Sequence, residues 1–341
     1  MTSASSSQAG SPLLSVRDLH VGFPSPHGLV KAVDGVSFDL KRGETLSLVG
    51  ESGCGKSTTA RAIIGLVRPS SGSIEFDGRD IAHDRRALAA ARSRLQMVFQ
   101  DPYASLDPRM DAGAIVGEPL VVHRRVRGRD ALDARVCELF ERVGLDPTMR
   151  RRYPHEFSGG QRQRIGLARA LALDPDVVLL DEPVSALDVS VQAQVLNLLE
   201  DLRRRHGLTY LFIAHNLGVV RHVSDRIAVM YLGRIVEIAP RDDLFARPVH
   251  PYTKALLSAV PVPDPDAEAR RRRIPIEGEI PSPTARIEGC AFRSRCPLAF
   301  DRCAVETPVL TERSSGRLAA CHLDDHLDEP SRPVPAGASP S

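Results

Sequence analysis

The sequence predicts an α/β fold that is interrupted by a helical insertion and followed by a small cysteine-containing extension. Strand and helix patterns alternate over residues 166–245, which is typical of an α/β core. A short apolar strand at residues 46–49 ends at a glycine-rich turn, and a helix pattern begins at Lys56. Residues 101–165 contain helical stretches broken by Pro and Gly, which predicts an insertion into that core. After about Pro251 the composition shifts toward Pro, Arg and Cys, which marks the extension.

The bulk properties exclude several classes of protein. The chain has 341 residues, more than one ordinary domain, which favours a main domain with an appendage. The formal net charge of +2 argues against a dedicated nucleic-acid-binding protein, because such proteins carry a strongly basic surface. No stretch approaches the roughly 18 consecutive apolar residues of a membrane span, and the start of the chain lacks a secretory signal pattern. We therefore expect a cytosolic location, where disulfides are rare and the six cysteines need another role.

These patterns also predict the domain boundaries. Residues 1–12 and 326–341 are expected to be disordered tails, because they are rich in small and polar residues and in Pro. Residues 13–255 are expected to form the main domain, with an antiparallel β subdomain near its start and the helical insertion at about 101–165. Residues 256–325 are expected to form the C-terminal extension.

A phosphate-binding loop is predicted between the apolar strand and the helix that follows it. Residues 50–57 match G-x-x-x-x-G-K-[ST], in which glycines let backbone N–H groups converge on phosphate oxygens. Lys56 is expected to reach the β- and γ-phosphates of a nucleotide, and Ser57 to offer its hydroxyl to Mg²⁺. A chance glycine turn is the weaker interpretation, because the Lys-Ser pair has this spacing. The expected nucleotide contacts are Gly50, Ser52, Gly53, Cys54, Gly55, Lys56, Ser57 and Thr58.

Two carboxylates follow a second apolar strand. Residues 177–180 form a run typical of a buried parallel strand, and Asp181 and Glu182 stand at its end. Asp181 is expected to hold Mg²⁺, mostly through water, and Glu182 to act as general base toward the attacking water. Two acids that simply begin a loop would be the ordinary interpretation if the phosphate-binding loop were absent.

His215 and Gln100 also follow apolar stretches. His215 ends the strand pattern at residues 210–213, in the unit after Glu182, so we expect it beside the γ-phosphate. Gln100 is expected to ligate Mg²⁺ through its side-chain carbonyl or to position water. Taken separately, a strand-end His and a polar strand cap are more often structural.

A second anion site is predicted at Ser158, Gly159, Gly160 and Gln161, which open a helix that runs through Leu173. Ser158 can cap this helix, and the two glycines expose backbone N–H groups. One nucleotide has one γ-phosphate, which the first loop already binds. Two chains that face each other head-to-tail would give the second anion site a γ-phosphate to bind, because the signature of each chain would complete the nucleotide site of the other.

With these motifs in this order, the chain resembles ABC-type ATPases over about residues 13–325. Within that superfamily it is similar to the ATP-binding subunits of oligopeptide, dipeptide and related nickel importers. The runs at 100–109 and 250–257 resemble the extended Q-loop and the start of the C-terminal extension of these subunits. The resemblance assigns family roles as follows: Walker A to 50–58, the Q-loop to Gln100, the signature to 158–161, Walker B and catalytic Glu to Asp181 and Glu182, the D-loop to 185–188 with Asp188, and the switch His to His215.

The resemblance implies a P-loop NTPase (RecA-like) core that binds ATP with Mg²⁺. Members of this family stack an aromatic residue on adenine, for which Phe23 is the candidate and His27 the rival. The implied partners are two integral membrane permease subunits, a second ATPase subunit that is either a related chain or another copy, and an extracytoplasmic solute-binding protein. No nucleic acid is expected. The implied location is the cytoplasmic face of the cell membrane.

The function that the resemblance implies is ATP hydrolysis that drives uptake of peptides. Import of nickel or another small solute is an alternative that the sequence barely separates from it. An exporter ATPase is less favoured, because such subunits usually lack the 250–257 segment and the cysteine-containing extension. A soluble ABC protein that acts on ribosomes or DNA would usually have two cassettes or a long coiled coil, and neither is present.

Four cysteines gather in the extension, at Cys290, Cys296, Cys303 and Cys321. Structural zinc sites usually have closer pairs, although four thiolates can hold either zinc or an iron–sulfur cluster. The resembling subunits carry a [4Fe–4S] cluster on such cysteines, so the cluster is expected here ahead of zinc. Four unligated thiols are the third alternative.

Overall fold

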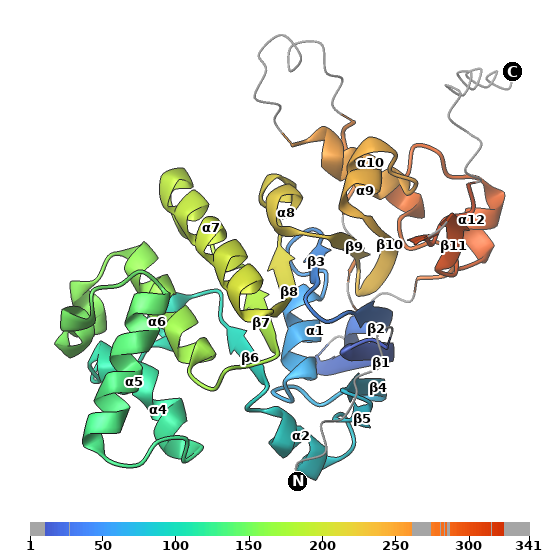
Figure 1. Ribbon diagram of the computed structural model, residues 1–341. Coiled ribbons are helices and arrows are strands. Elements are labelled where there is room, and N and C mark those ends of the chain that lie inside the picture. The colour runs from blue at the N-terminus through green and yellow to red at the C-terminus, as the bar shows by residue number, and fades with distance from the viewer. Residues whose placement is uncertain are drawn as a thin grey trace, which may run out of the picture.

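The computed structural model describes residues 11–26, 28–260, 274–279, 281–282, 284, 287–314 and 316–323. Figure 1 shows a central sheet with the helical region on one side and the C-terminal extension on the other. The predicted α/β class, with an antiparallel β subdomain and a helical insertion, is confirmed. The predicted tail at 326–341 and most of the tail at 1–12 lie outside the described residues.

The main sheet has eight strands in the order β11-β12-β10-β9-β3-β8-β7-β6. Strands β6, β7, β8, β3 and β9 are parallel to one another, so their carboxyl ends share one edge of the sheet. Strands β3, β7 and β8 are buried along their whole length, which explains their nearly continuous apolar sequences. The bounds are Thr45–Val49 (β3), Leu95–Val98 (β6), Val177–Asp181 (β7), Thr209–Ala214 (β8), Arg226–Tyr231 (β9), Arg234–Pro240 (β10), Thr311–Ser314 (β11) and Arg317–Ala319 (β12).

A second, four-stranded sheet forms the antiparallel subdomain in the order β2-β1-β4-β5. Its strands are β1 (Leu14–Ser25), β2 (Gly28–Leu40), β4 (Ser71–Phe76) and β5 (Arg79–Asp80), and helix α2 (Arg85–Ala91) follows. Helix α1 (Lys56–Ile63) lies between the two sheets (Figure 1), and its residue Ile63 shares an apolar core with Val16 and Leu48. The helix ends at Ile63, because Gly65 takes a left-handed φ of 73° and breaks the pattern.

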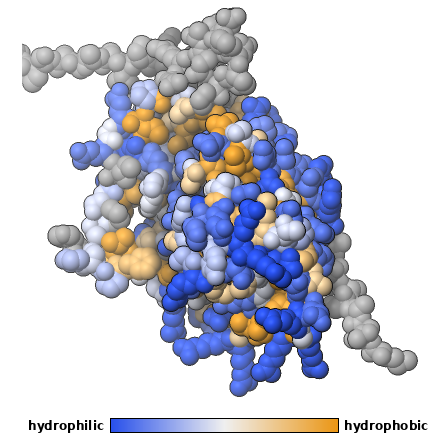
Figure 2. Space-filling view, turned by 90° about the vertical axis from the view of Figure 1, so that its left-hand side faces the viewer, coloured by the Kyte–Doolittle hydropathy of each residue, from blue (hydrophilic) through white to orange (hydrophobic). Residues whose placement is uncertain are grey.

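The helical insertion packs on the β6 side of the sheet (Figure 1). Ile115, Phe140 and Ile165 from three of its helices are buried in a shared core. Figure 2 views this face, on which hydrophilic side chains predominate and hydrophobic ones form separate patches. None of the helices in the described part of the chain has both the length and the apolar character needed to cross a membrane. The helices here and in the following βα units are α3 (Pro102–Ser105), α4 (Ala112–Val122), α5 (Arg129–Arg142), α6 (Gly159–Leu171), α7 (Val189–His206) and α8 (Leu217–Val223), with 3-10 turns at Pro147–Arg151 and Pro154–Glu156.

The C-terminal extension continues the main sheet. Strand β12 pairs antiparallel with β10 and β11 pairs with β12, so the sheet runs directly into the extension. The sequence predicted an appendage from composition and did not reveal this pairing. The helices of this part are α9 (Arg241–Ala246), α10 (Pro251–Ser258) and α12 (Asp301–Val305), with a 3-10 turn at Arg293–Arg295.

Two buried polar residues fix the start of α10. The carboxylate of Glu237 on β10 accepts the backbone N–H groups of Val249 and His250, each at 2.9 Å. The ring Nδ1 of His250 in turn accepts the N–H of Tyr252 at 3.0 Å and caps the helix. This bond requires an unprotonated Nδ1, and complete burial lowers the pKa of His250 to about 3.

We expect His250 to make the protein less stable below neutral pH. An unfolded chain has a His pKa of about 6.5 and binds the proton more readily than the folded state, whose His250 pKa is about 3. The stabilisation is therefore fully present above pH 6.5 and is lost progressively as the pH falls from 6.5 to 3. From pH 7 to pH 5 the free energy of unfolding should fall by about 2 kcal/mol more than in a His250→Asn variant, whose amide oxygen can still cap α10.

Urea unfolding of both proteins at the two pH values measures this difference. An equal loss of stability in the variant would show that His250 does not carry it.

Candidate functional site

The phosphate loop, residues 50–57, is held tightly between two strands. It joins the end of β3 to the start of α1. Gly50 has a φ of 153°, and a Cβ there would lie 2.2 Å from the carbonyl oxygen of Met230 on β9. Gly55 has a φ of 104°, and a Cβ there would lie 2.1 Å from the carbonyl oxygen of Ala32 on β2. Both glycines are therefore required by backbone conformation and by close approach.

Lys56 lies at the centre of this loop. It is 4% exposed, and its Nζ donates to the carbonyl oxygens of Gly50 at 2.8 Å and Glu51 at 2.9 Å. The Sγ of Cys54 lies 3.7 Å from the same ammonium, and burial raises the pKa of this thiol. The loop therefore holds one positive charge at the place where a phosphate would bind.

Ser57 and Asp181 come together from α1 and β7. The hydroxyl of Ser57 donates to Oδ1 of Asp181 at 2.7 Å. Asp181 is 1% exposed, and its Oδ2 is buried without a hydrogen-bond partner among the described residues. Burial raises the pKa of Asp181, because desolvation disfavours its charged form. A divalent cation would give Oδ2 its missing partner, and a hydroxyl beside a carboxylate is the donor set that Mg²⁺ takes in phosphate sites, so the residues fit Mg²⁺.

Glu182, Gln100 and His215 form a second cluster at the same edge. Gln100 donates its Nε2 to Oε2 of Glu182 at 2.9 Å, and Nδ1 of His215 lies 3.3 Å from the same oxygen. The Glu182 side chain is 14% exposed, and its backbone has a left-handed φ of 47°. A non-glycine residue in this conformation is strained, and strain of this kind concentrates at functional sites. The Glu182 N–H donates to Ile213 on β8 at 3.0 Å, which ties the strained residue to the neighbouring strand.

The topology explains why these residues meet. Gln100 follows β6, Glu182 follows β7 and His215 follows β8, and these parallel strands are neighbours in the sheet. Their carboxyl ends share one edge, where ligands bind in open parallel sheets. A small cavity of about 50 Å³ adjoins this cluster and is lined by Glu182, His215 and Gln192 among others.

The signature segment, residues 158–161, lies elsewhere in the chain. Ser158 and Gln161 form a capping box at the start of α6, with Ser158 Oγ accepting from Gln161 N at 3.3 Å. Gly160 lies against Val191 of α7, where a Cβ would come within 2.4 Å of its Cγ1. In the part of the chain that the structure describes, no hydrogen bond or ion pair joins Ser158, Gly159, Gly160 or Gln161 to the phosphate loop. Asp188 caps α7 with its backbone carbonyl, which accepts from Gln192 N at 2.8 Å.

The predicted adenine contact is not tested by these observations. Phe23 lies on β1, is 40% exposed and pairs in register with Val30 on β2. Its rival His27 lies outside the described residues. The role of Phe23 therefore stays a prediction.

The predicted metal site of the extension is wrong. Across the described residues, no group of three or more His, Cys, Asp or Glu side chains is arranged to hold a metal ion, so the structure supports neither the [4Fe–4S] cluster nor its zinc alternative. Burial raises the pKa of the Cys290 and Cys321 thiols, and that of Cys296 to about 11. Cys303 is buried and accepts the N–H of Cys290 through its backbone carbonyl at 2.8 Å.

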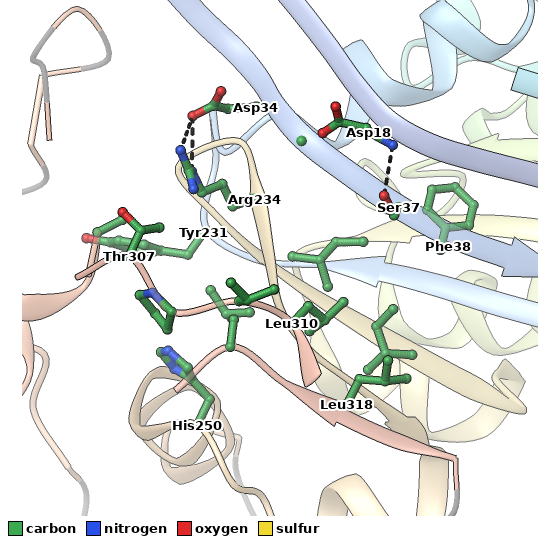
Figure 3. A pocket seen from close by; sticks show the side chains of 18 of the residues that line it. Asp18, Asp34, Ser37, Phe38, Tyr231, Arg234, His250, Thr307, Leu310 and Leu318 are labelled. Atoms are coloured by element: carbon green, nitrogen blue, oxygen red, sulfur yellow. Dashed lines mark hydrogen bonds and ion pairs between the residues drawn. The ribbon is translucent and has the colours of Figure 1, made fainter. Parts of the chain in front are cut away.

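An open cavity of about 650 Å³ lies between the extension and strands β1, β2, β9 and β10, and no residue of the phosphate loop lines it. Figure 3 shows Leu310 and Leu318 of the extension on one side of it, and Asp18 of β1 and Ser37 of β2 on the other. At its rim, Arg234 donates to Asp34 Oδ2 at 2.6 Å. No expected nucleotide contact lines this cavity.

Sequence reasoning missed two residues that reach the phosphate loop from the C-terminal part of the chain. The N–H of Glu51 donates to Tyr252 Oη at 3.0 Å, and Nη1 of Arg295 lies 2.9 Å from Glu51 Oε2. Tyr252 lies in the 250–257 run, which stands out in the sequence only because it resembles the start of the family's C-terminal extension. Nothing in the local sequence of Arg295 distinguishes it from the many other arginines.

Comparisons with known proteins agree with this geometry. A profile of the family described as "ABC transporter" matches residues 33–185, and one described as "Oligopeptide/dipeptide transporter, C-terminal region" matches residues 236–303. The chain is 51% identical over 320 residues to the oligopeptide transport ATP-binding protein AppF of Bacillus subtilis (strain 168), covering 91% of this chain and 97% of that protein. It is 54% identical over 323 residues to a probable peptide ABC transporter ATP-binding protein, y4tS, of Sinorhizobium fredii, covering 91% of this chain and 90% of that protein.

A solved structure extends the comparison to a nucleotide complex. It is described as a dimeric post-hydrolysis state of the ATP-binding cassette MJ0796 bound to ADP and Pi. It superimposes with a TM-score of 0.61 at 28% identity and covers 67% of this chain and 98% of that one.

Proposed function

Because this chain belongs to the ABC transporter family, among the oligopeptide transport ATP-binding proteins, we propose that it hydrolyses ATP to drive peptide import across a membrane. Its core is that of a P-loop NTPase, and its class of activity is ATP hydrolysis. One observation carries the proposal. The Ser57–Asp181 pair and the cluster of Glu182, Gln100 and His215 lie at one sheet edge, next to a phosphate loop whose close packing requires glycines.

ATP binds with its β- and γ-phosphates in the phosphate loop in this proposal. Lys56 turns its ammonium from the loop carbonyls of Gly50 and Glu51 toward the phosphate oxygens, within the reach that its central position gives. Ser57 and Asp181 would hold Mg²⁺, whose positive charge would offset the charge that develops on the phosphates. The adenine lies toward the antiparallel subdomain, where Phe23 is the proposed stacking partner.

Hydrolysis depends on Glu182 in this mechanism. Gln100 and His215 both contact its Oε2, which fixes the carboxylate and leaves Oε1 to accept a hydrogen bond from the attacking water. Glu182 then takes up the proton of that water as it attacks the γ-phosphate. His215 lies beside this position and can donate to a γ-phosphate oxygen.

A second ATPase chain completes each site. The signature segment caps α6 and does not contact the phosphate loop of its own chain within the described residues, which supports its acting on a partner's nucleotide. Asp188 at the start of α7 is proposed to lie at the same interface. The partner is either another copy or a related chain.

Two integral membrane permease subunits are the proposed cargo-carrying partners, with a solute-binding protein outside the membrane. The helical insertion near Gln100 is the proposed docking region. Val121 and Val122 at the end of α4 are 56% and 69% exposed, and they would lie in this contact. The chain would then lie at the cytoplasmic face of the cell membrane.

A pull-down tests this function. A tagged Glu182→Gln chain is incubated with ATP and Mg²⁺ in native membranes, and the co-purifying proteins are identified; the same chain without ATP is the control. We expect two integral membrane proteins, a second ATPase and a solute-binding protein. The cargo of that binding protein decides between peptides and nickel or another small solute. Ribosomes or DNA-repair factors without any membrane protein would overturn the transport function and leave the ATPase assignment intact.

A further inference from the structure

We propose that Tyr252 and Arg295 are positioning residues for ATP binding, which act by holding Glu51 in the phosphate loop. The inference rests on the proposed function, because it concerns the same nucleotide site. It assigns to the C-terminal part of the chain a direct effect on ATP affinity.

Tyr252 reaches the loop from α10. Its side chain is fully buried, and its Oη accepts the N–H of Glu51 at 3.0 Å. Its ring packs against Tyr231 at 4.8 Å and Phe292 at 5.3 Å between ring centroids. These aromatic contacts fix the hydroxyl in place, so that it holds the backbone at the start of the loop in one position.

Arg295 reaches the same residue from the extension. Its Nη1 lies 2.9 Å from Glu51 Oε2, and its side chain is 7% exposed. Two backbone hydrogen bonds fix the short turn that carries it. The N–H of Arg295 donates to the carbonyl of Phe292 at 3.0 Å, and the N–H of Cys290 donates to the carbonyl of Cys303 at 2.8 Å. A charge pair as sheltered as this one is screened much less than a surface pair.

The charge of Glu51 explains why the ion pair matters. A carboxylate within a loop that binds a polyanion repels its ligand unless a cation neutralises it. Arg295 supplies that cation from outside the loop. The carbonyl of Glu51 also accepts from Lys56 Nζ at 2.9 Å, so the position of Glu51 directly affects the group that binds phosphate.

Binding of mant-ATP to the full chain, followed by fluorescence, tests the role of Arg295. Arg295→Ala should weaken binding about tenfold, because it leaves the Glu51 carboxylate unpaired. Arg295→Lys keeps the charge and should stay within about threefold of the wild type. Glu51→Gln combined with Arg295→Ala removes both charges and should recover most of the lost affinity.

The control is Arg226→Ala. Arg226 forms a comparably sheltered pair with Glu44 at 3.1 Å, with side-chain exposures of 22% and 9%, and has no contact with the phosphate loop among the described residues. It should change mant-ATP binding less than about twofold.

Tyr252→Phe tests the hydroxyl separately. It removes the acceptor of the Glu51 N–H but keeps the ring, and we expect mant-ATP binding to weaken about threefold or more. Tyr210→Phe is the matched control, because it removes a buried hydroxyl that donates to Leu199 at 3.0 Å. Both variants should lower the melting temperature by similar amounts, and Tyr252→Phe alone should weaken binding.

These measurements distinguish a failure of the proposed function from a failure of the positioning role. A wild-type chain that does not bind mant-ATP contradicts the proposed function itself. A wild type that binds, with Arg295→Ala and Tyr252→Phe binding equally well, overturns the positioning role. The positioning role is also overturned if Arg226→Ala loses as much affinity as Arg295→Ala and Tyr210→Phe loses as much as Tyr252→Phe.

Discussion

Replacing Glu182 with Gln is expected to lower ATP turnover by a factor of about 100 to 10 000 while ATP binding is retained. The amide keeps the size of the side chain and can still contact Gln100 and His215, which both lie near its Oε2. It cannot accept a proton from water, so the loss falls on the chemical step. Phosphate release measures turnover, and mant-ATP fluorescence measures binding.

Glu200→Gln is the matched control for this substitution. Glu200 is an exposed carboxylate on α7, 3.8 Å from Arg204, so the same chemical change there should leave turnover within about twofold of the wild type. Wild-type turnover in Glu182→Gln would show that another group takes up the proton.

Replacing Gly55 with Ala should weaken ATP binding about 100-fold through geometry, without changing any charge. The added Cβ would lie 2.1 Å from the backbone oxygen of Ala32, so the phosphate loop must move away from β2. A displacement of about 1 Å at a site that positions phosphates costs about 100-fold in function. The left-handed φ of 104° adds strain for any residue with a Cβ. Titration with mant-ATP measures the loss of affinity.

Gly78→Ala separates the clash from the strain. Gly78 precedes β5 with a φ of 74°, and a Cβ there meets nothing within 4 Å. It should lower stability by about 1 kcal/mol and leave ATP binding unchanged. If Gly55→Ala binds ATP as well as Gly78→Ala does, the close approach to Ala32 is not what fixes the loop.

The parts of the site that the sequence predicted are those encoded in short runs. The phosphate loop follows β3 and Glu182 follows β7, and both strands are short, mostly apolar segments that can be recognised without knowledge of distant partners. Parallel pairing then brings their ends together. The class of fold could be predicted in the same way, because the spacing of strands and helices is local.

The parts that the sequence missed depend on contacts between distant residues. Strand β11 reads Thr-Glu-Arg-Ser, is mostly exposed and has no apolar alternation, so only its pairing with β12 reveals it. The contact of Arg295 with Glu51 spans 244 positions of sequence. The metal site predicted at the four cysteines is wrong for a related reason. The number of cysteines and the resemblance suggested a cluster, but the sequence does not show whether the four side chains come together, and among the described residues they form no group that could hold a metal ion.

The pairing of β12 with β10 affects how the chain can be divided. Without the extension, β10 would be the edge strand of the main sheet, and the N–H of Ala320 would no longer donate to Val236, a bond of 2.8 Å. An open edge of this kind recruits strands from other molecules and leads to aggregation. We therefore expect a chain shortened before β12 to aggregate more readily than the whole protein, so the full chain is the better choice for biochemical work.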